Sequence, residues 1–552
     1  MPFRARLFLT AFLPLLLCAF DAAAQRSTVC TITVNSPDEK EVLQRNLPED
    51  KYRFVELVER GRPDWLASAC RSGVQCDVLV ISGHFDAGTE FYTDRLNQRE
   101  SLQVEEMERV SCGGSCPGLF SHLKEVYLFG CNTLNGETGE STGAEIVRNL
   151  VSAGQPRADA ERLAQDLTRR YAESNRDAMR RIFVDVPVIY GFSSLAPLGP
   201  VAGGLLGRYF QSASAPEIGS GQTSQALLRQ FAAQSMIAAS GLTGADPRLA
   251  ARAEVCQFVD DRLASAQKLD AVHRILGRDM AEVRMLFDRI EKFTGGLDDA
   301  TRADPAVARA LAAIAGDLPA RERYLGFARN DDRPPVRARM IALAGALGWL
   351  DATAQRVELG HMLADQLAAD AIGFADVDLA CALNADHTLD PERQRLHLSA
   401  ALRDKPANAA VLACLGSDEG HARMLRALTS ADDREVQLAQ VYFRHRPIAD
   451  VNELRAAALG IARMPASDAQ VRALDTLALH YVADRESLEP LARLFQKARS
   501  VAVQRAIAGV LIRSDYRALG RPELLRVLRE YRLKSPDGAD LIDALIRRLQ
   551  LA

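Results

Sequence analysis

Two short apolar segments constrain the fold of this chain more than any other feature. Residues 77–84 read DVLVISGH, and residues 125–131 read EVYLFGC. Short apolar runs bounded by serine or glycine are typical of strands that are buried on both faces, as in parallel sheets covered by helices. The two segments therefore predict an α/β fold with a mostly parallel sheet.

The alternation of strand and helix extends from residue 28 to residue 211. The predicted strands are 29–34, 52–58, 77–84, 125–131 and 186–192, and the segments between them carry helical periodicity. This order predicts helices on both faces of the sheet. We assign residues 26–211 to the α/β domain, and residues 212–224, which are rich in serine, glycine and alanine, to a linker.

The rest of the chain, residues 225–552, has a different character, because helical segments follow one another with almost no strand pattern. Similar apolar segments begin near Pro335, Val471 and Val503, with a weaker copy near Val436. Intervals of roughly 30 to 35 residues are typical of stacked helix pairs similar to HEAT repeats. The sequence thus predicts an all-α helical-repeat domain, with an irregular helical bundle as the alternative.

The first 24 residues have the pattern of a secretory signal peptide. A basic start precedes an apolar run at 7–20, and three alanines at 22–24 precede Gln25. We expect cleavage after residue 24 and a periplasmic or secreted protein. The apolar run is too short to span a bilayer, and no longer one follows it. The sequence therefore predicts no integral membrane segment after cleavage.

Export changes how the cysteines are interpreted, because thiols outside the cytoplasm are usually paired. The chain has 10 cysteines, and loss of Cys18 with the signal peptide leaves nine. An odd number means that at least one is unpaired or bonded between chains. The short loop between Cys112 and Cys116 allows local closure, as does the spacing of Cys70 and Cys76. Spacing alone leaves the connectivity open.

Two of the predicted strands end in a reactive residue, His84 and Cys131. In an open α/β sheet, ligands bind at the carboxyl ends of the strands. If these two strands are neighbours, an imidazole lies beside a thiol and can hold it as the nucleophilic thiolate. Alone, such a cysteine is more often a small core residue, so it is the pairing that favours catalysis. Cys131 is also the candidate for the unpaired cysteine, because no other cysteine has this position.

The order of these parts resembles the caspase-like superfamily of cysteine peptidases, which includes caspases, gingipains, separase and bacterial CHAT domains. In that superfamily the catalytic histidine follows one apolar strand and the catalytic cysteine follows the next. The matching segments here are 78–84 (VLVISGH) and 126–133 (VYLFGCNT). Residues 188–197 (VIYGFSSLAP) are similar to the segment that borders the substrate cleft. The resemblance implies a His84–Cys131 dyad that cleaves a protein or peptide substrate.

The resemblance also implies further site residues. The oxyanion would be bound by the backbone N–H groups of Cys131 and of the residue after the histidine. That residue is usually glycine in the superfamily and is Phe85 here, whose N–H can still donate. A side chain of this size is expected to narrow the cleft. Asn132, Ser193 and Ser194 are predicted to contact the substrate.

Other chemistries have weaker support. Asp86 or Asp94 is a candidate to orient the imidazole, although the superfamily does not require a third member. Cys112, Cys116 and His122 are possible metal ligands, but only three are local and export favours a disulfide. We therefore predict no metal and no cofactor. The formal net charge of −4 provides no argument for a nucleic-acid partner.

Two functions follow from these observations. The first is an exported caspase-like cysteine endopeptidase whose helical repeats recruit or regulate a protein partner. The second is a catalytically inactive pseudopeptidase that serves as a protein-interaction scaffold. The paired positions of His84 and Cys131 favour the first, and Phe85 favours the second.

Overall fold

A computed structural model describes residues 26–57, 66–85, 88–94, 100–114, 116, 118–137, 142–171, 174–212, 218–246, 248–368, 372–396, 399–533 and 541–551. The predicted signal peptide, residues 1–24, lies outside these ranges. The chain divides into two compact units. Unit 1 contains Met1–Phe293 and Asp299–Thr301, and unit 2 contains Thr294–Asp298 and Arg302–Ala552.

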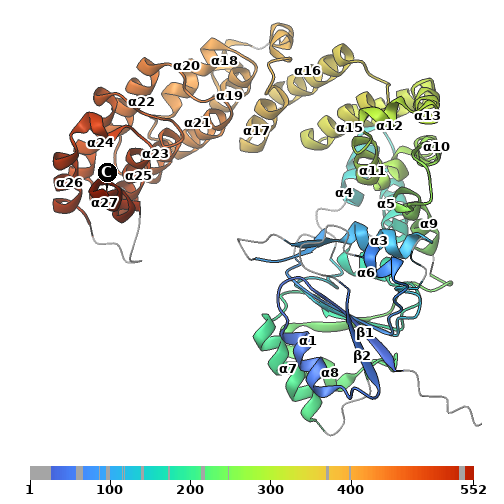
Figure 1. The fold of residues 1–552 in the computed structure, drawn as a ribbon. Coiled ribbons are helices and arrows are strands. Elements are labelled where there is room, and N and C mark those ends of the chain that lie inside the picture. Colours follow the sequence, from blue (N-terminus) through green and yellow to red (C-terminus); the bar gives the residue numbers. More distant parts are fainter. Residues whose placement is uncertain are drawn as a thin grey trace, which may run out of the picture. The chain divides into compact units, whose positions relative to one another are not determined.

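Unit 1 is built around a six-stranded sheet (Figure 1). Its strands are β1 (Ser27–Thr33), β2 (Tyr52–Glu56), β3 (Val78–Ser82), β6 (Glu125–Phe129), β7 (Val188–Phe192) and β8 (Met236–Ala239). The order across the sheet is β2-β1-β3-β6-β7-β8. All neighbouring pairs are parallel except β7 and β8, which are antiparallel. The prediction of an α/β domain with a mostly parallel sheet is confirmed.

Helices cover both faces of this sheet, which explains why its strands are apolar throughout. On β3, Val78 and Val80 belong to the core beneath α1 (Asp38–Asn46) and α7 (Gly199–Gln211). Leu79 and Ile81 belong to the opposite core, beneath α3 (Val104–Cys112) and α6 (Asn175–Ile182). Because successive side chains of a strand point to opposite faces, a strand between two helical layers has no polar side.

Further elements complete unit 1. The helices are α2 (Ala67–Arg71), α4 (Thr142–Ser152), α5 (Arg157–Tyr171), α8 (Gln225–Gln230), α9 (Arg248–Val259), α10 (Ser265–Leu276) and α11 (Met280–Gly295). A short antiparallel hairpin of β4 (Glu90–Tyr92) and β5 (Ser101–Gln103) precedes α3. Strands of three residues carry too little pattern to be predicted from sequence.

Unit 1 continues well past residue 211, where our sequence analysis ended the α/β domain. β8 pairs with β7 at the edge of the sheet, although it lies beyond the predicted linker 212–224. The disulfide between Cys112 and Cys256 joins α3 to α9, and a buried ion pair between Arg284 and Glu145 joins α11 to α4. These long-range bonds attach the segment from α9 through α11 to the sheet domain. Of the predicted linker, residues 213–217 lie outside the described ranges.

Unit 2 is helical wherever the structure describes secondary structure in it. Its α-helices are α12 (Asp299–Ala303, shared with unit 1), α13 (Pro305–Ala315), α14 (Leu318–Asn330), α15 (Pro334–Ala346), α16 (Ala352–Ala368), α17 (Phe374–Leu383), α18 (Ala400–Asp404), α19 (Pro406–Cys414), α20 (Asp418–Ala427), α21 (Asp433–His445), α22 (Val451–Arg463), α23 (Asp468–Leu477), α24 (Arg485–Lys497), α25 (Val501–Ile512), α26 (Arg521–Glu530) and α27 (Leu541–Leu551). The prediction of an all-α C-terminal region is confirmed.

The later helices of unit 2 pack in two rows (Figure 1). In one row α19, α21, α23, α25 and α27 follow one another, and in the other α22, α24 and α26 do. Val436, Val471 and Val503, which mark the sequence repeat, lie on α21, α23 and α25. Each helix from α20 to α25 begins after a serine or aspartate whose side chain accepts a backbone N–H of its first turn. This packing favours stacked helix pairs over an irregular bundle.

Eight cysteines form four disulfides. The pairs are Cys30–Cys76, Cys70–Cys116, Cys112–Cys256 and Cys381–Cys414. Neither of the local closures that the spacing allows is formed, because the fold brings cysteines of different elements together. Cys30 lies on β1, for example, and Cys76 just before its neighbour β3. Cys131 is the free cysteine of the described residues, as predicted. Four disulfides are consistent with a protein that works outside the cytoplasm.

A search of the described residues for a helix that is long and apolar enough to cross a bilayer finds none.

Candidate active site

The strands that end before His84 and Cys131 are neighbours in the sheet. β3 and β6 pair in parallel, with Ser82 opposite Phe129. His84 lies two residues after Ser82, and Cys131 lies two residues after Phe129. Both are therefore at the same edge of the sheet. The N–H of Gly83 donates to the carbonyl of Phe129 over 3.1 Å and extends the pairing toward the site. The sheet thus brings the two predicted catalytic residues to its carboxyl edge.

His84 and Cys131 line one pocket. Its other walls are residues 35, 36 and 39 after β1, the ends of β3 and β6, and residues 196–199 before and at the start of α7. The pocket has a free volume of about 50 Å³. That is small beside the roughly 300–1,000 Å³ of typical ligand pockets.

Phe85 does not occupy this pocket. Its side chain is 0% exposed and belongs to the core on the α3 side of the sheet. The ring centroids of Phe85 and Phe91 are 4.6 Å apart. A Cβ on Gly130 would lie 2.8 Å from the Phe85 Cβ, so a glycine is needed before Cys131. The expectation that the phenylalanine narrows the cleft was wrong, because its ring turns into the core.

His84 is anchored through its backbone and not through Nε2 of its imidazole. Its backbone N–H and carbonyl both pair with Tyr92 over 2.9 Å. Nε2 is buried and has no hydrogen-bond partner among the described residues. The Asp94 carboxylate lies 3.4 Å from Nε2, outside hydrogen-bond geometry, and its side chain is 69% exposed. Asp94 is therefore a loosely placed counter-ion, and Asp86 lies outside the described residues.

The Cys131 sulfur is partly exposed and accepts one hydrogen bond. The backbone N–H of Ala196, in the loop between β7 and α7, donates to Sγ over 3.4 Å. The β7–α7 loop is therefore part of the surroundings of Cys131, although our sequence analysis singled out Ser193 and Ser194 in it and missed Ala196.

Two backbone N–H groups just after β3 and β6 have no backbone acceptor among the described residues. Within the part of the chain that the structure describes, neither the N–H of Phe85 nor that of Cys131 has an acceptor. An unpaired N–H in a folded protein is uncommon. Both groups belong to residues that the sequence analysis predicted for this role, and the arrangement is compatible with it.

The other predicted substrate-binding residues do not line the pocket. Asn132 has a left-handed backbone with φ +59°, and its N–H donates to the Ser194 carbonyl over 2.7 Å. The Ser193 hydroxyl donates to the carbonyl of Ser235, and the Ser194 hydroxyl lies 2.5 Å from that of Ser235. In this structure Asn132, Ser193 and Ser194 therefore support the loops around Cys131.

A buried carboxyl group also lines the pocket. Glu39, in the first turn of α1, is 2% exposed, and its Oε2 has no hydrogen-bond partner among the described residues. Burial, with a smaller contribution from the charge of Asp38, raises the pKa of Glu39 to about 8. Near neutral pH this group is an uncharged acid beside His84 and Cys131. Its position after β1, the strand next to β3, was the signal that could have found it.

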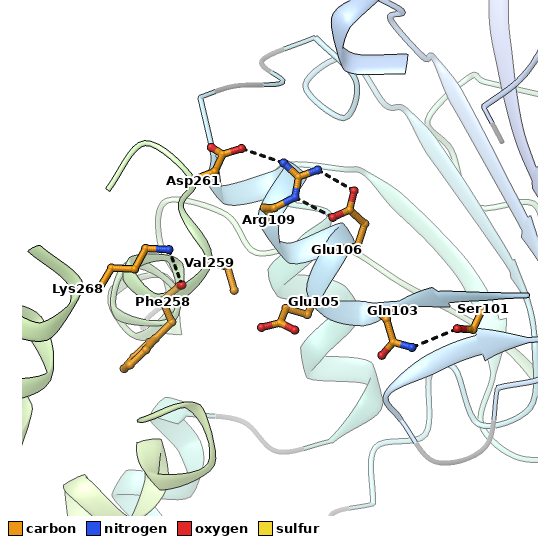
Figure 2. Close-up of a pocket in the computed structure, with 9 residues that line it drawn as sticks. All are labelled: Ser101, Gln103, Glu105, Glu106, Arg109, Phe258, Val259, Asp261 and Lys268. Carbon is orange, nitrogen blue, oxygen red and sulfur yellow. Dashed lines mark hydrogen bonds and ion pairs between the residues drawn. The ribbon is translucent and has the colours of Figure 1, made fainter. Parts of the chain in front are cut away.

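A larger cleft of about 510 Å³ lies elsewhere in unit 1, between α3 and the segment joining α9 to α10 (Figure 2). It contains neither His84 nor Cys131. Figure 2 shows that its cations are already engaged: Arg109 binds Glu106 and Asp261, and Lys268 donates to the Phe258 carbonyl over 2.9 Å. The Arg109–Asp261 pair braces the segment after α9 against α3, and Lys268 joins α10 to α9.

The metal alternative at Cys112, Cys116 and His122 is excluded, because both thiols are held in disulfides.

No protein-family model, no curated protein and no solved structure gives a significant match to this chain.

Proposed function

We propose that unit 1 is a caspase-like cysteine endopeptidase domain in which His84 and Cys131 form the catalytic dyad. The observation that carries this proposal is that both residues line one pocket at the carboxyl ends of neighbouring parallel strands. Support comes from the unbonded Nε2 of His84 and from the absence of a disulfide partner for Cys131. A caspase-like family assignment is part of the proposal.

The proposed reaction follows from the positions of these groups. His84 takes the thiol proton through Nε2, and the Cys131 thiolate attacks the carbonyl carbon of the scissile peptide bond. The N–H groups of Phe85 and Cys131 bind the oxyanion of the tetrahedral intermediate. His84 then protonates the leaving amine, and water hydrolyses the thioester with His84 as base. Removing one such oxyanion donor typically costs ~100-fold or more in rate.

A second function is supported by the small size of the pocket. A free volume of about 50 Å³ is far below the roughly 300 Å³ or more of a typical ligand pocket, which favours a pseudopeptidase whose surface binds proteins. In that case unit 2 carries the function, because stacked helices form extended protein-binding surfaces. The two functions differ in the chemistry expected of Cys131.

The test is alkylation of the mature full-length protein with iodoacetamide between pH 5 and pH 9, followed by peptide mass spectrometry at Cys131. An ordinary thiol, with a pKa of about 8.5, is only about 1% thiolate at pH 6.5. The endopeptidase proposal expects labelling at pH 6.5 roughly 10-fold or more above that level. His84→Ala should abolish the excess, and His122→Ala, at an exposed histidine of the same unit, should leave it unchanged.

Labelling of Cys131 no faster than an ordinary thiol, or equal labelling in the His84→Ala variant, would refute the dyad. If the dyad is present, the next step is to find the substrate. The full chain carrying Cys131→Ala can bind a protein substrate without cleaving it. Proteins bound by this variant and cleaved by the wild type are substrates, whereas proteins bound by both without cleavage would support the pseudopeptidase.

A further inference from the structure

Only part of the loop that reaches the Cys131 sulfur is anchored by apolar packing, because Ala196 packs against the core on the α7 side of the sheet. Leu195 and Leu198, on either side of Ala196 and Pro197, are 75% and 69% exposed. Such a loop needs polar contacts to hold a fixed position, because exposed side chains contribute little packing. The N–H of Ala196 nevertheless lies 3.4 Å from the Cys131 Sγ. The start of the loop, before Ala196, is therefore held by polar contacts from another part of the fold.

Ser235 supplies those contacts. It lies just before β8, and its carbonyl accepts from the N–H of Ser193 over 3.1 Å and from the Ser193 hydroxyl over 3.3 Å. Its own hydroxyl donates to the Gln234 carbonyl over 2.7 Å. Because a hydroxyl has one proton, the Ser194 hydroxyl, 2.5 Å away, must be the donor in the contact between the two serines. Three hydrogen bonds thus tie Ser235 to the start of the loop.

The backbone of Ser235 is in an unfavourable conformation. Its φ of +55° and ψ of 31° lie in the left-handed region. Glycine adopts this conformation without an energetic penalty, whereas serine adopts it at a cost. Strained residues of this kind concentrate at functional sites. Asn132, next to Cys131, has the same conformation, and its N–H donates to the Ser194 carbonyl. Ser194 is thereby held between two left-handed residues, one of which adjoins the nucleophile.

We propose that Ser235 is a positioning residue of the Cys131 site. Through Ser194 it holds the β7–α7 loop so that the Ala196 N–H stays on the sulfur and favours the thiolate. This inference rests on the proposed function, since it requires a reactive Cys131. The alternative is that Ser235 merely begins β8, a role that needs its backbone conformation but not its hydroxyl.

Two variants separate these roles. Ser235→Gly keeps the left-handed backbone and removes the hydroxyl, and Ser194→Ala removes the other half of the same hydrogen bond. Each should lower the labelling rate of Cys131 at pH 6.5 by about 3- to 10-fold, which is the effect of one hydrogen bond. The pH midpoint of labelling should move upward in both. The double variant should lose no more than either single variant, because both remove one shared bond.

The matched control is Ser212→Ala, which removes a hydroxyl bonded to the Tyr209 carbonyl at the far end of α7. It should leave the pH profile of labelling unchanged. Thermal melting of each variant verifies that the fold is retained.

The outcomes distinguish the two proposals. If wild-type Cys131 labels rapidly at pH 6.5 and neither variant slows it, the role of Ser235 is refuted and the dyad stands. Losses that multiply in the double variant would also refute it, because the two hydroxyls would then act separately. If wild-type Cys131 labels no faster than an ordinary thiol, the proposed function fails, and the role of Ser235 fails with it.

Discussion

Replacing Glu39 by glutamine should make this protein more stable at neutral and alkaline pH. The Glu39 side chain is buried beside the His84–Cys131 pocket, and its Oε2 has no hydrogen-bond partner among the described residues. Burial raises its pKa from an ordinary value of 4.5 to about 8. Glutamine has nearly the same shape and cannot ionise, so the Glu39→Gln variant removes the penalty for a charge at this place and keeps the packing.

The size and sign of the effect follow from proton linkage. Between pH 4.5 and pH 8 the folded protein keeps the Glu39 proton and the unfolded chain releases it, so unfolding becomes more favourable as the pH rises. The stability of the wild type should therefore fall with pH through this window, by about 1.4 kcal/mol for each pH unit. Relative to the wild type, the variant should gain about 4 kcal/mol between pH 5 and pH 8.

Urea denaturation of both proteins at pH 5, 6, 7 and 8 measures this difference directly. Other titrating groups are common to both proteins and largely cancel in the comparison. The control is Glu41→Gln, at an exposed position of the same helix, which should show no pH-dependent gain. A gain from Glu39→Gln that stays constant across pH would mean that the carboxyl is ionised in the folded protein, and the argument from burial would be wrong.

Three further predictions address the core, the disulfides and the histidine. Phe85→Ala should lower the free energy of unfolding by about 3–5 kcal/mol, because the buried ring leaves a cavity; a loss below about 1 kcal/mol in urea denaturation would contradict its core position. Replacing Cys112 and Cys256 by serine removes a cross-link between residues 144 apart, and should cost about 3–5 kcal/mol in denaturation without reductant. An unchanged midpoint would mean that the bond is not formed. Asp94→Asn should change iodoacetamide labelling of the pocket thiol by less than about 2-fold, since its carboxylate is exposed. A loss as large as that of His84→Ala would make Asp94 part of the catalytic machinery.

Much of the candidate site could be predicted from short segments of sequence. An apolar run such as 78–82 is recognisable because every position of a strand between two helical layers is buried. The residues that follow such a run lie at the carboxyl edge of the sheet wherever the strand is placed. His84 and Cys131 were therefore identified by local pattern, and so was Cys131 as the odd cysteine.

The sequence did not predict which distant segments meet. Cys112 bonds to Cys256, 144 residues away, although Cys116 is the nearer thiol along the chain. The direction of the Phe85 ring depends on Phe91, which belongs to a hairpin too short to be recognised. β8 joins the sheet through its pairing with β7, and its four residues carry little strand pattern of their own. In each case the contact joins two segments, and the hydrophobic pattern within either segment does not indicate its partner.

The sequence by itself determined the five parallel strands, the helical C-terminal region and the two candidate residues at the strand ends. Only the tertiary structure decided what surrounds them: the acid of Glu39, the N–H of Ala196 and the strained turn at Ser235. The physical reason is that hydrophobic periodicity reports whether a residue is buried, whereas the environment of a buried group depends on which other segments pack against it. Reactivity at Cys131 depends on those neighbours.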